Sequence, residues 1–239
     1  MLPEKPQITD AEEEYLQSLF WLFEAGLPMT AANVGRAMQL SAPTVSEMVG
    51  RLERDGYISR DPDRTISFTA SGRADAERIV SRHRMIERFL TDVVGVPWDE
   101  VHEEAERLEH AMTPRFEAYV RSSVGDARTC PHGHPIRVGE RIDGVPLADC
   151  AVGAQVTILR LENEAEDLLH YLKDSGIAPG LSGEITGKDD EHITVSNADG
   201  DATVTISVAE TVSVTSEPSP PPRIALPDQL VLGQGRYGR

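Results

Sequence analysis

The side chains with the clearest capacity for chemistry lie in the segment HEEAERLEH, where histidines and carboxylates repeat at helical spacing. His102, Glu106, Glu109 and His110 occupy positions i, i+4, i+7 and i+8. Because successive residues of a helix turn by about 100°, these four side chains fall within an arc of about 100°. The segment therefore predicts a helix that presents imidazole and carboxylate groups on one face.

A further pair of such groups precedes this segment. His83 and Glu87 are i, i+4 neighbours, which share one face of a helix. Imidazole and carboxylate without thiolate suit divalent ions such as Mn²⁺, Fe²⁺, Co²⁺ or Zn²⁺, and do not suit Cu(I). Three histidines and three carboxylates on two adjacent helices thus predict a metal site. The alternative that spacing leaves open is a solvated acidic helix face.

Enzymatic chemistry is not indicated by the motifs. His102-Glu103 begins like the zinc-protease motif HExxH, but position i+4 is Glu106 instead of histidine. The sequence contains no GxSxG nucleophile motif and no phosphate-binding P-loop. Cys130 lies close to two histidines in CPHGHPI, but the neighbouring prolines and glycines favour a turn over a set of metal ligands. We therefore expect a protein that is not an enzyme.

The elements that precede the metal-binding pattern predict a DNA-reading unit. Residues 10–25, 31–38 and 42–56 have the apolar spacing and the capping residues of helices. Residues 57–69 follow as two short strands around the turn Asp61-Pro62-Asp63. This order of elements is that of a winged helix-turn-helix. The alternative left open is that the same elements form a protein–protein module.

In a winged helix-turn-helix, the second helix of the turn motif enters the major groove with its N-terminal residues at the base edges. Small hydroxyl side chains there can bond to bases or phosphates, and arginines of the hairpin suit the phosphate backbone. We expect DNA contacts from Arg36, Ser41, Pro43, Thr44, Ser46, Glu47, Arg51, Arg60 and Arg64.

The sequence divides into five segments and predicts a mainly α fold. The winged helix-turn-helix occupies residues 1–72, and a helical domain with the metal-binding pattern occupies residues 73–140. Residues 141–152 are expected to form a linker. Residues 153–216 contain short β-branched runs around one helical patch, which is typical of a small β-barrel. Residues 217–239 form a Pro- and Gly-rich tail.

Composition and charge are compatible with a cytoplasmic DNA-binding protein. The N-terminal segment lacks the features of a signal peptide, and no apolar run approaches the roughly 20 residues that span a bilayer, so no membrane partner is expected. The two cysteines form neither a disulfide framework nor a CxxC site. The net charge of −17 argues against a nucleic-acid partner, but the arginines and acids between residues 36 and 64 balance one another.

Four segments, in this order, resemble the diphtheria-toxin-repressor family of metal-dependent repressors: SAPTVSEMVGRLERDGYI, TASGR, RHRMIERFL and VHEEAERLEH. The match covers residues 8–140 closely and extends more loosely through a C-terminal SH3-like barrel. The resemblance implies a homodimer that binds palindromic operator DNA, as one dimer or two, when loaded with Fe²⁺ or Mn²⁺. It also implies that the helical domain mediates dimerisation and that the protein represses genes for metal uptake.

The resemblance also implies two metal sites. The activating site would use Glu14 of the first helix together with Glu106, Glu109 and His110. The ancillary site would use His83, Glu87 and His102, completed by Glu164 and Asp167 from the barrel domain.

Two positions favour manganese. Iron-responsive members have Met at the position of Glu14 and Cys at that of Glu106, whereas manganese-responsive members have carboxylates there. Because hard oxygen ligands suit Mn²⁺, we predict a Mn²⁺-dependent repressor. Fe²⁺ is the alternative, and Co²⁺, Zn²⁺, Ni²⁺ and Cd²⁺ are substitutes in vitro. Gln17 replaces a glutamate of some manganese members, which argues against a two-manganese cluster of their kind, and Glu47 replaces a base-contacting Gln, so the operator should differ.

Two other functions are compatible with parts of the sequence. The first is a winged-helix regulator that answers to an organic ligand or a partner protein, and operator binding that ignores metal would support it. The second is a metal-dependent hydrolase, which needs an open coordination position and a base that no motif supplies.

Overall fold

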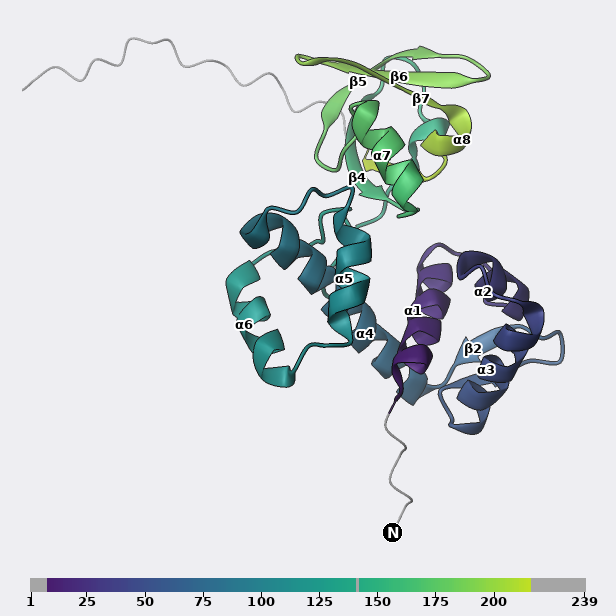
Figure 1. Ribbon diagram of the computed structural model, residues 1–239. Helices are drawn as coiled ribbons and strands as arrows, with labels where there is room; N and C mark the ends of the chain where they lie inside the picture. The colour runs from purple at the N-terminus through teal and green to yellow at the C-terminus, as the bar shows by residue number, and fades with distance from the viewer. Residues whose placement is uncertain (1–7, 141, 216–239) are drawn as a thin grey trace, which may run out of the picture.

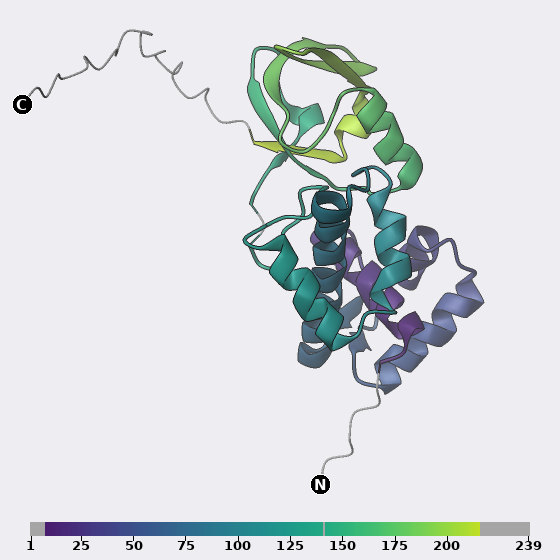
Figure 2. The ribbon, with the colours of Figure 1, turned by 60° about the vertical axis from the view of Figure 1, so that its left-hand side comes forward.

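The computed structural model describes residues 8–140 and 142–215, so the predicted tail over residues 217–239 lies outside the described residues. Three parts follow one another along the chain: a small N-terminal unit, a set of helices around the long helix α4, and a C-terminal unit with a curved sheet (Figures 1 and 2). Among the described residues, no helix combines the length and the apolar character that crossing a membrane requires.

The N-terminal unit has the element order of a winged helix-turn-helix, as predicted. It consists of α1 (Asp10–Glu24), α2 (Ala31–Ala37), α3 (Ala42–Arg54) and the antiparallel hairpin of β1 (Ile58–Arg60) and β2 (Ile66–Phe68). The side chains of Thr30 and Ser41 cap α2 and α3 by accepting backbone hydrogen bonds. Leucine, valine, isoleucine and aromatic side chains from all of these elements form one buried core.

The helical part is built on α4 (Ala70–Phe89), which packs against α1, against α5 (Val101–Glu109) and against α6 (Pro114–Val124). A short π-helix, η1 (Leu90–Val94), extends α4 and ends at Gly95, whose φ of 89° is left-handed. At the other end of α4, a Cβ on Gly72 would lie 1.7 Å from the carbonyl oxygen of Tyr57. Glycine is therefore required where α4 meets the N-terminal unit.

The C-terminal unit contains a six-stranded antiparallel sheet in the order β3-β8-β4-β5-β6-β7. Its elements are β3 (Val145–Pro146), η2 (Leu147–Asp149), β4 (Gln155–Leu161), α7 (Glu166–Asp174), β5 (Ser182–Lys188), β6 (His192–Asn197), β7 (Gly200–Thr205), α8 (Ile206–Ala209) and β8 (Val212–Thr215).

The predicted linker over residues 141–152 is corrected by the structure. Within it, β3 pairs with β8, and Leu147 and Cys150 belong to the buried core of the C-terminal unit. The sheet therefore begins at residue 145, before the predicted start of the domain at residue 153. The Gly and Pro residues of this stretch favoured the prediction of a linker, although apolar residues between them are buried.

The helical part and the C-terminal unit are joined by apolar and polar contacts. Trp98 packs against the core of the C-terminal unit, and Lys173 of α7 donates a hydrogen bond of 2.6 Å to Asp99. A turn at residues 130–134 runs between them. The Leu161 amide at the end of β4 donates a hydrogen bond to the His132 carbonyl oxygen, and the guanidinium of Arg88 on α4 donates to the carbonyl oxygens of Thr129 and Cys130. These contacts place the turn beside α4 and α5.

Candidate metal centre

The packing of α4 on α5 brings together the side chains predicted for the ancillary site. The Nε2 atom of His83 lies 3.1 Å from Oε1 of Glu87, one helical turn later, and 3.3 Å from Nδ1 of His102 on α5. His83 and Glu87 are fully buried, at 1% and 0% exposure. Glu164, from the loop before α7, completes the group, with its Oε2 atom 2.9 Å from His102 Nδ1.

This group fits a divalent cation. Four donors at about 2.1 Å from a tetrahedral ion lie about 3.4 Å from one another, close to the 2.9–3.3 Å found here. The Oε2 atom of Glu87 is buried and has no hydrogen-bond partner among the described residues. An isolated buried carboxylate oxygen is costly, so the arrangement requires a positive charge close to it.

The histidines have a second feature of metal ligands, because the ring nitrogen that points away from the group faces an acceptor. The Nδ1 atom of His83 lies 3.0 Å from Oε2 of Glu109, and the Nε2 atom of His102 lies 3.5 Å from Oε1 of Glu106. Such a partner holds a proton on the outward nitrogen and leaves the inward nitrogen free to bind an ion.

The turn at CPHGHPI contributes to the same region, which the sequence analysis did not predict. The Nδ1 atom of His132 lies 3.4 Å from Glu87 Oε1, and Cys130 joins these two residues in a group of possible ligands. Gly133 makes this approach possible, because its φ is 92° and a Cβ there would lie 1.9 Å from the Leu159 carbonyl oxygen. The only signal in the sequence is the spacing of one cysteine and two histidines within five residues.

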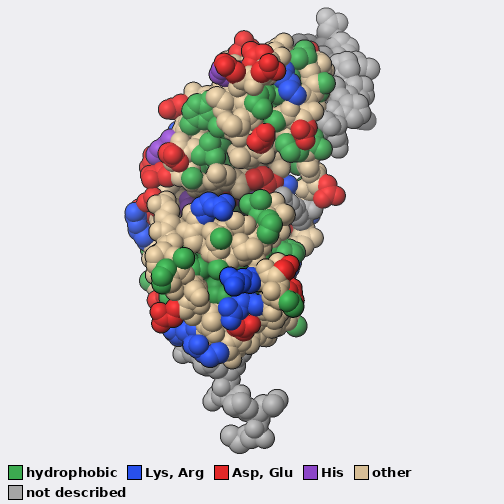
Figure 3. Space-filling view, turned by 90° about the vertical axis from the view of Figure 1, so that its right-hand side faces the viewer, with side chains coloured by type: hydrophobic (Ala, Val, Ile, Leu, Met, Phe, Trp, Pro, Cys, Tyr) green, Lys and Arg blue, Asp and Glu red, His purple; other side chains and the backbone are tan. Residues whose placement is uncertain are grey.

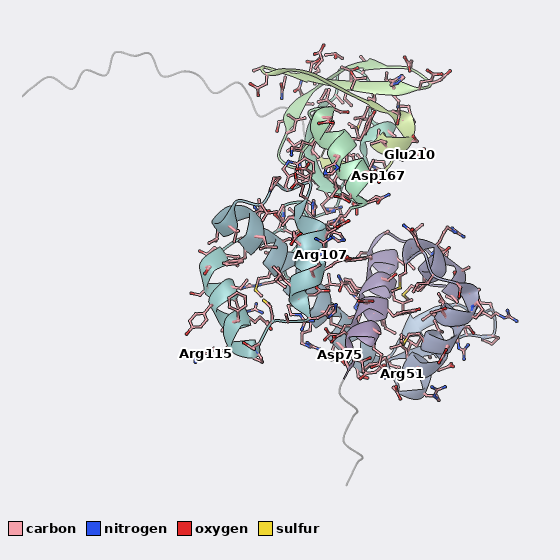
Figure 4. All side chains as sticks on the ribbon, in the orientation of Figure 1. Arg51, Asp75, Arg107, Arg115, Asp167 and Glu210 are labelled. Atoms are coloured by element: carbon pink, nitrogen blue, oxygen red, sulfur yellow. The ribbon has the colours of Figure 1, made fainter. Side chains whose placement is uncertain are left out.

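Asp167 was predicted as an ancillary ligand together with Glu164. The structure places Asp167 at the exposed N-terminal end of α7, where its Oδ1 atom accepts a hydrogen bond of 2.9 Å from the Leu168 amide (Figure 4). It is not among the residues that the structure groups with Glu164. His132 and His134 occupy that side of the group instead, 3.6 and 3.3 Å from Glu164 Oε1.

The charges of the centre balance one another. Burial opposes a charge on His83, but the charge of Glu87 and hydrogen bonds to Glu109 and Glu87 raise its pKa to about 9. Burial also opposes a charge on His102 and on His132, yet the neighbouring carboxylates raise both pKa values well above the ordinary range. Protonated histidines thus provide, within the protein itself, the positive charge that the buried carboxylates require.

The pKa values of the carboxylates are shifted in the opposite direction, below their ordinary range. Burial raises the pKa of Glu87, but the charges of His132 and His83 hold it well below its ordinary range. Burial and the charge of Glu87 both raise the pKa of Glu164, but His132 and His102 outweigh them and lower it to about 2. Both carboxylates are therefore ionised at neutral pH and available as ligands.

The residues predicted for the activating site lie next to this centre, between α1 and α5. The Nε2 atom of His110 is 3.7 Å from Glu14 Oε1 and 3.7 Å from Glu109 Oε1. Glu106 is turned toward His102 and not toward His110. The structure thus brings three of the four predicted ligands together and places Glu106 between the two sites.

The residues predicted to contact DNA lie on the N-terminal unit. Figure 3 shows Lys and Arg side chains over the lower part of one face, below the more acidic C-terminal unit. Except for the half-buried Arg51, the predicted residues are exposed: Arg36, Ser41, Pro43, Thr44, Ser46, Glu47, Arg60 and Arg64. Ser41 and Thr44 share a hydroxyl–hydroxyl hydrogen bond of 2.7 Å at the start of α3.

Two of these arginines already have carboxylate partners. Arg51 Nε lies 3.0 Å from Oε1 of Glu12 at the start of α1, and Arg60 of the hairpin pairs with Glu53 of α3. Arg64 forms the tip of the hairpin in a left-handed conformation, with a φ of 70°. The unit thus presents the exposed N-terminal residues of α3 beside the arginines of the hairpin.

A helix-turn-helix with an arginine-bearing hairpin, joined to a buried cluster of histidines and carboxylates, defines a metal-responsive DNA-binding regulator. Comparisons with known proteins agree with this class. Residues 7–66 match the family described as iron dependent repressor, N-terminal DNA binding domain, and residues 69–137 match its metal binding and dimerisation domain. Residues 145–216 match the FeoA domain.

Relatives cover most of the chain. The chain is 34% identical to the iron-dependent repressor IdeR of Mycobacterium tuberculosis (strain H37Rv) over 189 residues, which are 72% of this chain and 82% of the relative. It is 32% identical to the diphtheria toxin repressor of Corynebacterium diphtheriae over 221 residues, which are 87% and 97% of the two chains. A solved structure described as a manganese-dependent transcriptional repressor in complex with manganese has a TM-score of 0.78 at 27% identity, and the alignment covers 86% of this chain and 100% of that one.

The chain belongs to the iron-dependent repressor family, the family of the diphtheria toxin repressor. The prediction of a metal-dependent transcriptional repressor that is not an enzyme is confirmed. The predicted architecture is confirmed as a DNA-binding unit, a helical dimerisation domain and a C-terminal FeoA domain that contains a sheet.

The raised pKa of His83 predicts how the stability of the metal-stripped protein depends on pH. Its contribution is fully present below the unfolded pKa of 6.5 and is lost as pH rises through about 9. His102 and His132 shift in the same direction. We expect the free energy of unfolding, measured with urea in the presence of a chelator, to fall between pH 6.5 and pH 9.

Substitution of a buried and of an exposed histidine separates this effect from general alkaline destabilisation. His83→Gln should flatten the fall in the free energy of unfolding, whereas His192→Gln, on an exposed strand position, should leave it unchanged. A free energy that stays constant or rises over this range in the unsubstituted protein would contradict the assignment of a protonated His83.

Proposed function

We propose that this chain represses genes for metal uptake by binding palindromic operator DNA as a homodimer when Mn²⁺ occupies its metal sites. The observation that carries this proposal is the buried His–carboxylate centre between the helix-turn-helix unit and the C-terminal domain. Because the protein acts on chromosomal DNA, we place it in the cytoplasm. The domain boundaries that we propose are residues 1–72, 73–140 and 145–216, the last with an SH3-like curvature of the sheet.

Manganese is favoured by the ligands proposed for the activating site. Glu14, Glu106 and Glu109 provide carboxylate oxygens, His110 provides imidazole, and no sulfur belongs to this set. Hard oxygen ligands suit Mn²⁺. The relatives include both an iron-dependent repressor by name and a structure described as manganese-dependent, so Fe²⁺ is the alternative cofactor.

Helix α1 connects the DNA-facing unit with the rest of the protein through three consecutive carboxylates. Glu12 lies 3.0 Å from Arg51 of α3, and Glu13 lies 2.5 Å from Arg82 of α4. Glu13 and Glu14 lie 3.6 and 3.7 Å from His110, which follows α5. A shift of this turn of α1 must therefore alter the position of the recognition helix relative to α4 and α5.

Regulation follows from the charges that meet at this turn. Glu14 and Glu109 both approach His110, so two carboxylates from different domains share one imidazole. A bound divalent ion supplies the positive charge that offsets their repulsion. Glu14 then holds α1 in one position against α5, and the two recognition helices of a dimer keep the spacing of adjacent half-sites. Such coupling is usually worth about 1–3 kcal/mol per site.

His83 links the ancillary site to the activating site. Its Nε2 atom belongs to the ancillary group, and its Nδ1 atom lies 3.0 Å from Oε2 of Glu109. When Nε2 binds a metal ion, the proton of the imidazole is on Nδ1, and this N–H donates a hydrogen bond to Glu109. This hydrogen bond orients Glu109, whose other oxygen faces His110. Occupation of the ancillary site thus prepares a ligand of the activating site.

An apolar patch on the helical domain is the face on which we propose that the second copy packs. It consists of Val93 and Val94 of η1 and Phe116 and Tyr119 of α6, which are exposed in the described chain. The two elements are in contact, so these side chains are carried by adjoining elements. The description of this domain as a dimerisation domain supports the choice of a second copy as the partner. Binding of one or of two dimers to each operator is compatible with this face.

The proposed function is tested by operator binding of chelator-stripped protein, titrated separately with Mn²⁺, Fe²⁺ under anaerobic conditions and Zn²⁺ at fixed salt. Fluorescence anisotropy of labelled operator DNA gives the affinity. We expect tight binding at the lowest concentration with Mn²⁺. Equal binding with and without metal would show that the regulator answers to another signal.

Loss of an activating ligand should abolish the response to metal without unfolding the protein. We expect Glu106→Ala and His110→Ala each to remove metal-stimulated operator binding in the anisotropy assay, because the site loses a charge or an imidazole. Glu104→Ala is the control, because Glu104 lies on the same helix but is exposed and pairs with Arg107. Circular dichroism checks the fold, and a normal metal response of either ligand variant would refute the site.

The dimer face is tested with a charge placed in the apolar patch. Val94→Asp should convert the dimer to a monomer in sedimentation velocity, because an unpaired carboxylate would be buried between the two copies. Val152→Asp, at a similarly exposed valine of the C-terminal domain, should leave the dimer intact. A Val94→Asp protein that remains dimeric would place the interface elsewhere.

A further inference from the structure

The proposed ancillary site and the DNA-facing unit belong to different parts of the chain. The group of possible ligands is His83, Glu87, His102 and Glu164, which come from α4, α5 and the loop before α7. Among the described residues, this group contains none from the N-terminal unit. An effect of this site on the N-terminal unit must therefore pass through residues outside the group.

Trp21 of α1 lies against both histidines of this group. The centre of its ring system lies 5.8 Å from that of His83, with an interplanar angle of 72°, and 5.5 Å from that of His102, with an angle of 46°. The two imidazole rings lie 4.9 Å apart at an angle of 67°. These are edge-on and tilted arrangements, at distances where aromatic rings attract one another. Three rings from three helices thus form one cluster.

Trp21 is also part of the N-terminal unit. It is half-buried and packs against the core of that unit, to which α3 contributes Val45, Val49 and Leu52. Trp21 follows Glu14 by seven residues, so both side chains project from the same face of α1. The indole therefore contacts the ancillary histidines and the core that supports the recognition helix.

We propose that Trp21 is a positioning residue that transmits occupation of the ancillary site to α1. This inference rests on the proposed function, in which the site binds a divalent ion, and it adds a second connection to the one through His83 and Glu109. A bound ion fixes the orientation of both imidazoles, because a ligand nitrogen of each must point toward it. The rings of His83 and His102 then offer the indole one fixed surface, and α1 is held more firmly against α4.

The fluorescence of Trp21 tests the link between the ring cluster and the ion. The chain has two tryptophans, and Trp98 contacts the His132 ring, so the titration uses Trp98→Phe, in which Trp21 alone emits. The metal-stripped protein is titrated with Zn²⁺, which has no redox chemistry. We expect the emission to change as the ancillary site fills. The change should disappear when Glu164→Gln is added, and it should remain when the activating ligand His110 is replaced by alanine.

Two fluorescence results would overturn the proposal. One is an emission that stays constant while elemental analysis shows bound Zn²⁺, and the other is a change that persists at the same Zn²⁺ concentration with Glu164→Gln added. If Trp98→Phe folds poorly, the difference between the spectra of the unsubstituted protein and of Trp21→Phe gives the same signal. The emission is measured without DNA, so its outcome is separate from the operator titration that tests the proposed function.

Operator binding tests whether this contact carries the signal. In the Mn²⁺-loaded protein, we expect Trp21→Leu and Glu164→Gln each to weaken operator binding by about fivefold, the usual size of one aromatic contact. Because both changes interrupt one connection, the double variant should bind about as tightly as the weaker single variant. Trp21→Phe keeps an aromatic ring and should restore most of the response. Phe23→Leu is the matched control, because Phe23 lies on the same helix but contacts Phe20 and Arg73.

The double variant distinguishes positioning from simple packing. If the two single effects multiply in the double variant, Trp21 stabilises the fold independently of the ancillary site, and the proposal is wrong. An equal loss of operator binding in Phe23→Leu, or an unchanged operator affinity in Trp21→Leu, would lead to the same conclusion. Circular dichroism of each variant checks that its helices are retained.

Discussion

The structure depends above all on the burial of two carboxylates, Glu87 and Glu164, where the helical part meets the C-terminal unit. Removal of a carboxylate from water costs several kcal/mol unless a positive charge compensates it. Here the compensation comes from imidazoles on α4, on α5 and on the turn at residues 130–134. Because each element contributes one part of this balance, the elements are held together by the same charges that would bind a metal ion.

The need to compensate the buried charge of Glu164 explains why the FeoA domain lies against the helical domain. Its buried core consists of its own residues, and among the described residues outside the domain Trp98 is the one hydrophobic side chain packed against it. The polar contacts across the boundary include those of Glu164 with three histidines, those of Lys173 and His170 with Asp99, and the hydrogen bonds of the Leu161 backbone with His132 and His134. A boundary with so few apolar contacts is sensitive to charge. We therefore expect the position of the FeoA domain to depend on the charge in the proposed ancillary site.

The helical part of the site could be predicted from the sequence, because helical periodicity determines which side chains share one face of a helix. His83 and Glu87 share a face of α4 through i, i+4 spacing, and His102 follows on the neighbouring helix. The contribution of the turn at residues 130–134 could not be predicted, because it depends on the approach of Gly133 to β4, a contact between residues distant in the sequence. For the same reason Glu164 required a family resemblance, and Asp167, placed by that resemblance, instead accepts a hydrogen bond from its own helix.

The same electrostatic reasoning connects the metal sites with DNA. Arg51, on the recognition helix, pairs with Glu12 of α1, two residues before Glu14. A guanidinium that is already paired has less charge to offer a phosphate, so we expect a strong pair with Glu12 to weaken the proposed contact of Arg51 with DNA. Glu12 and Glu14 lie on the same turn of α1. A movement of α1 that brings Glu14 closer to His110 therefore also moves Glu12, which pairs with Arg51. The acidic start of α1 thus connects the residues of the proposed activating site, through Glu14, with the proposed DNA-binding surface, through Glu12 and Arg51.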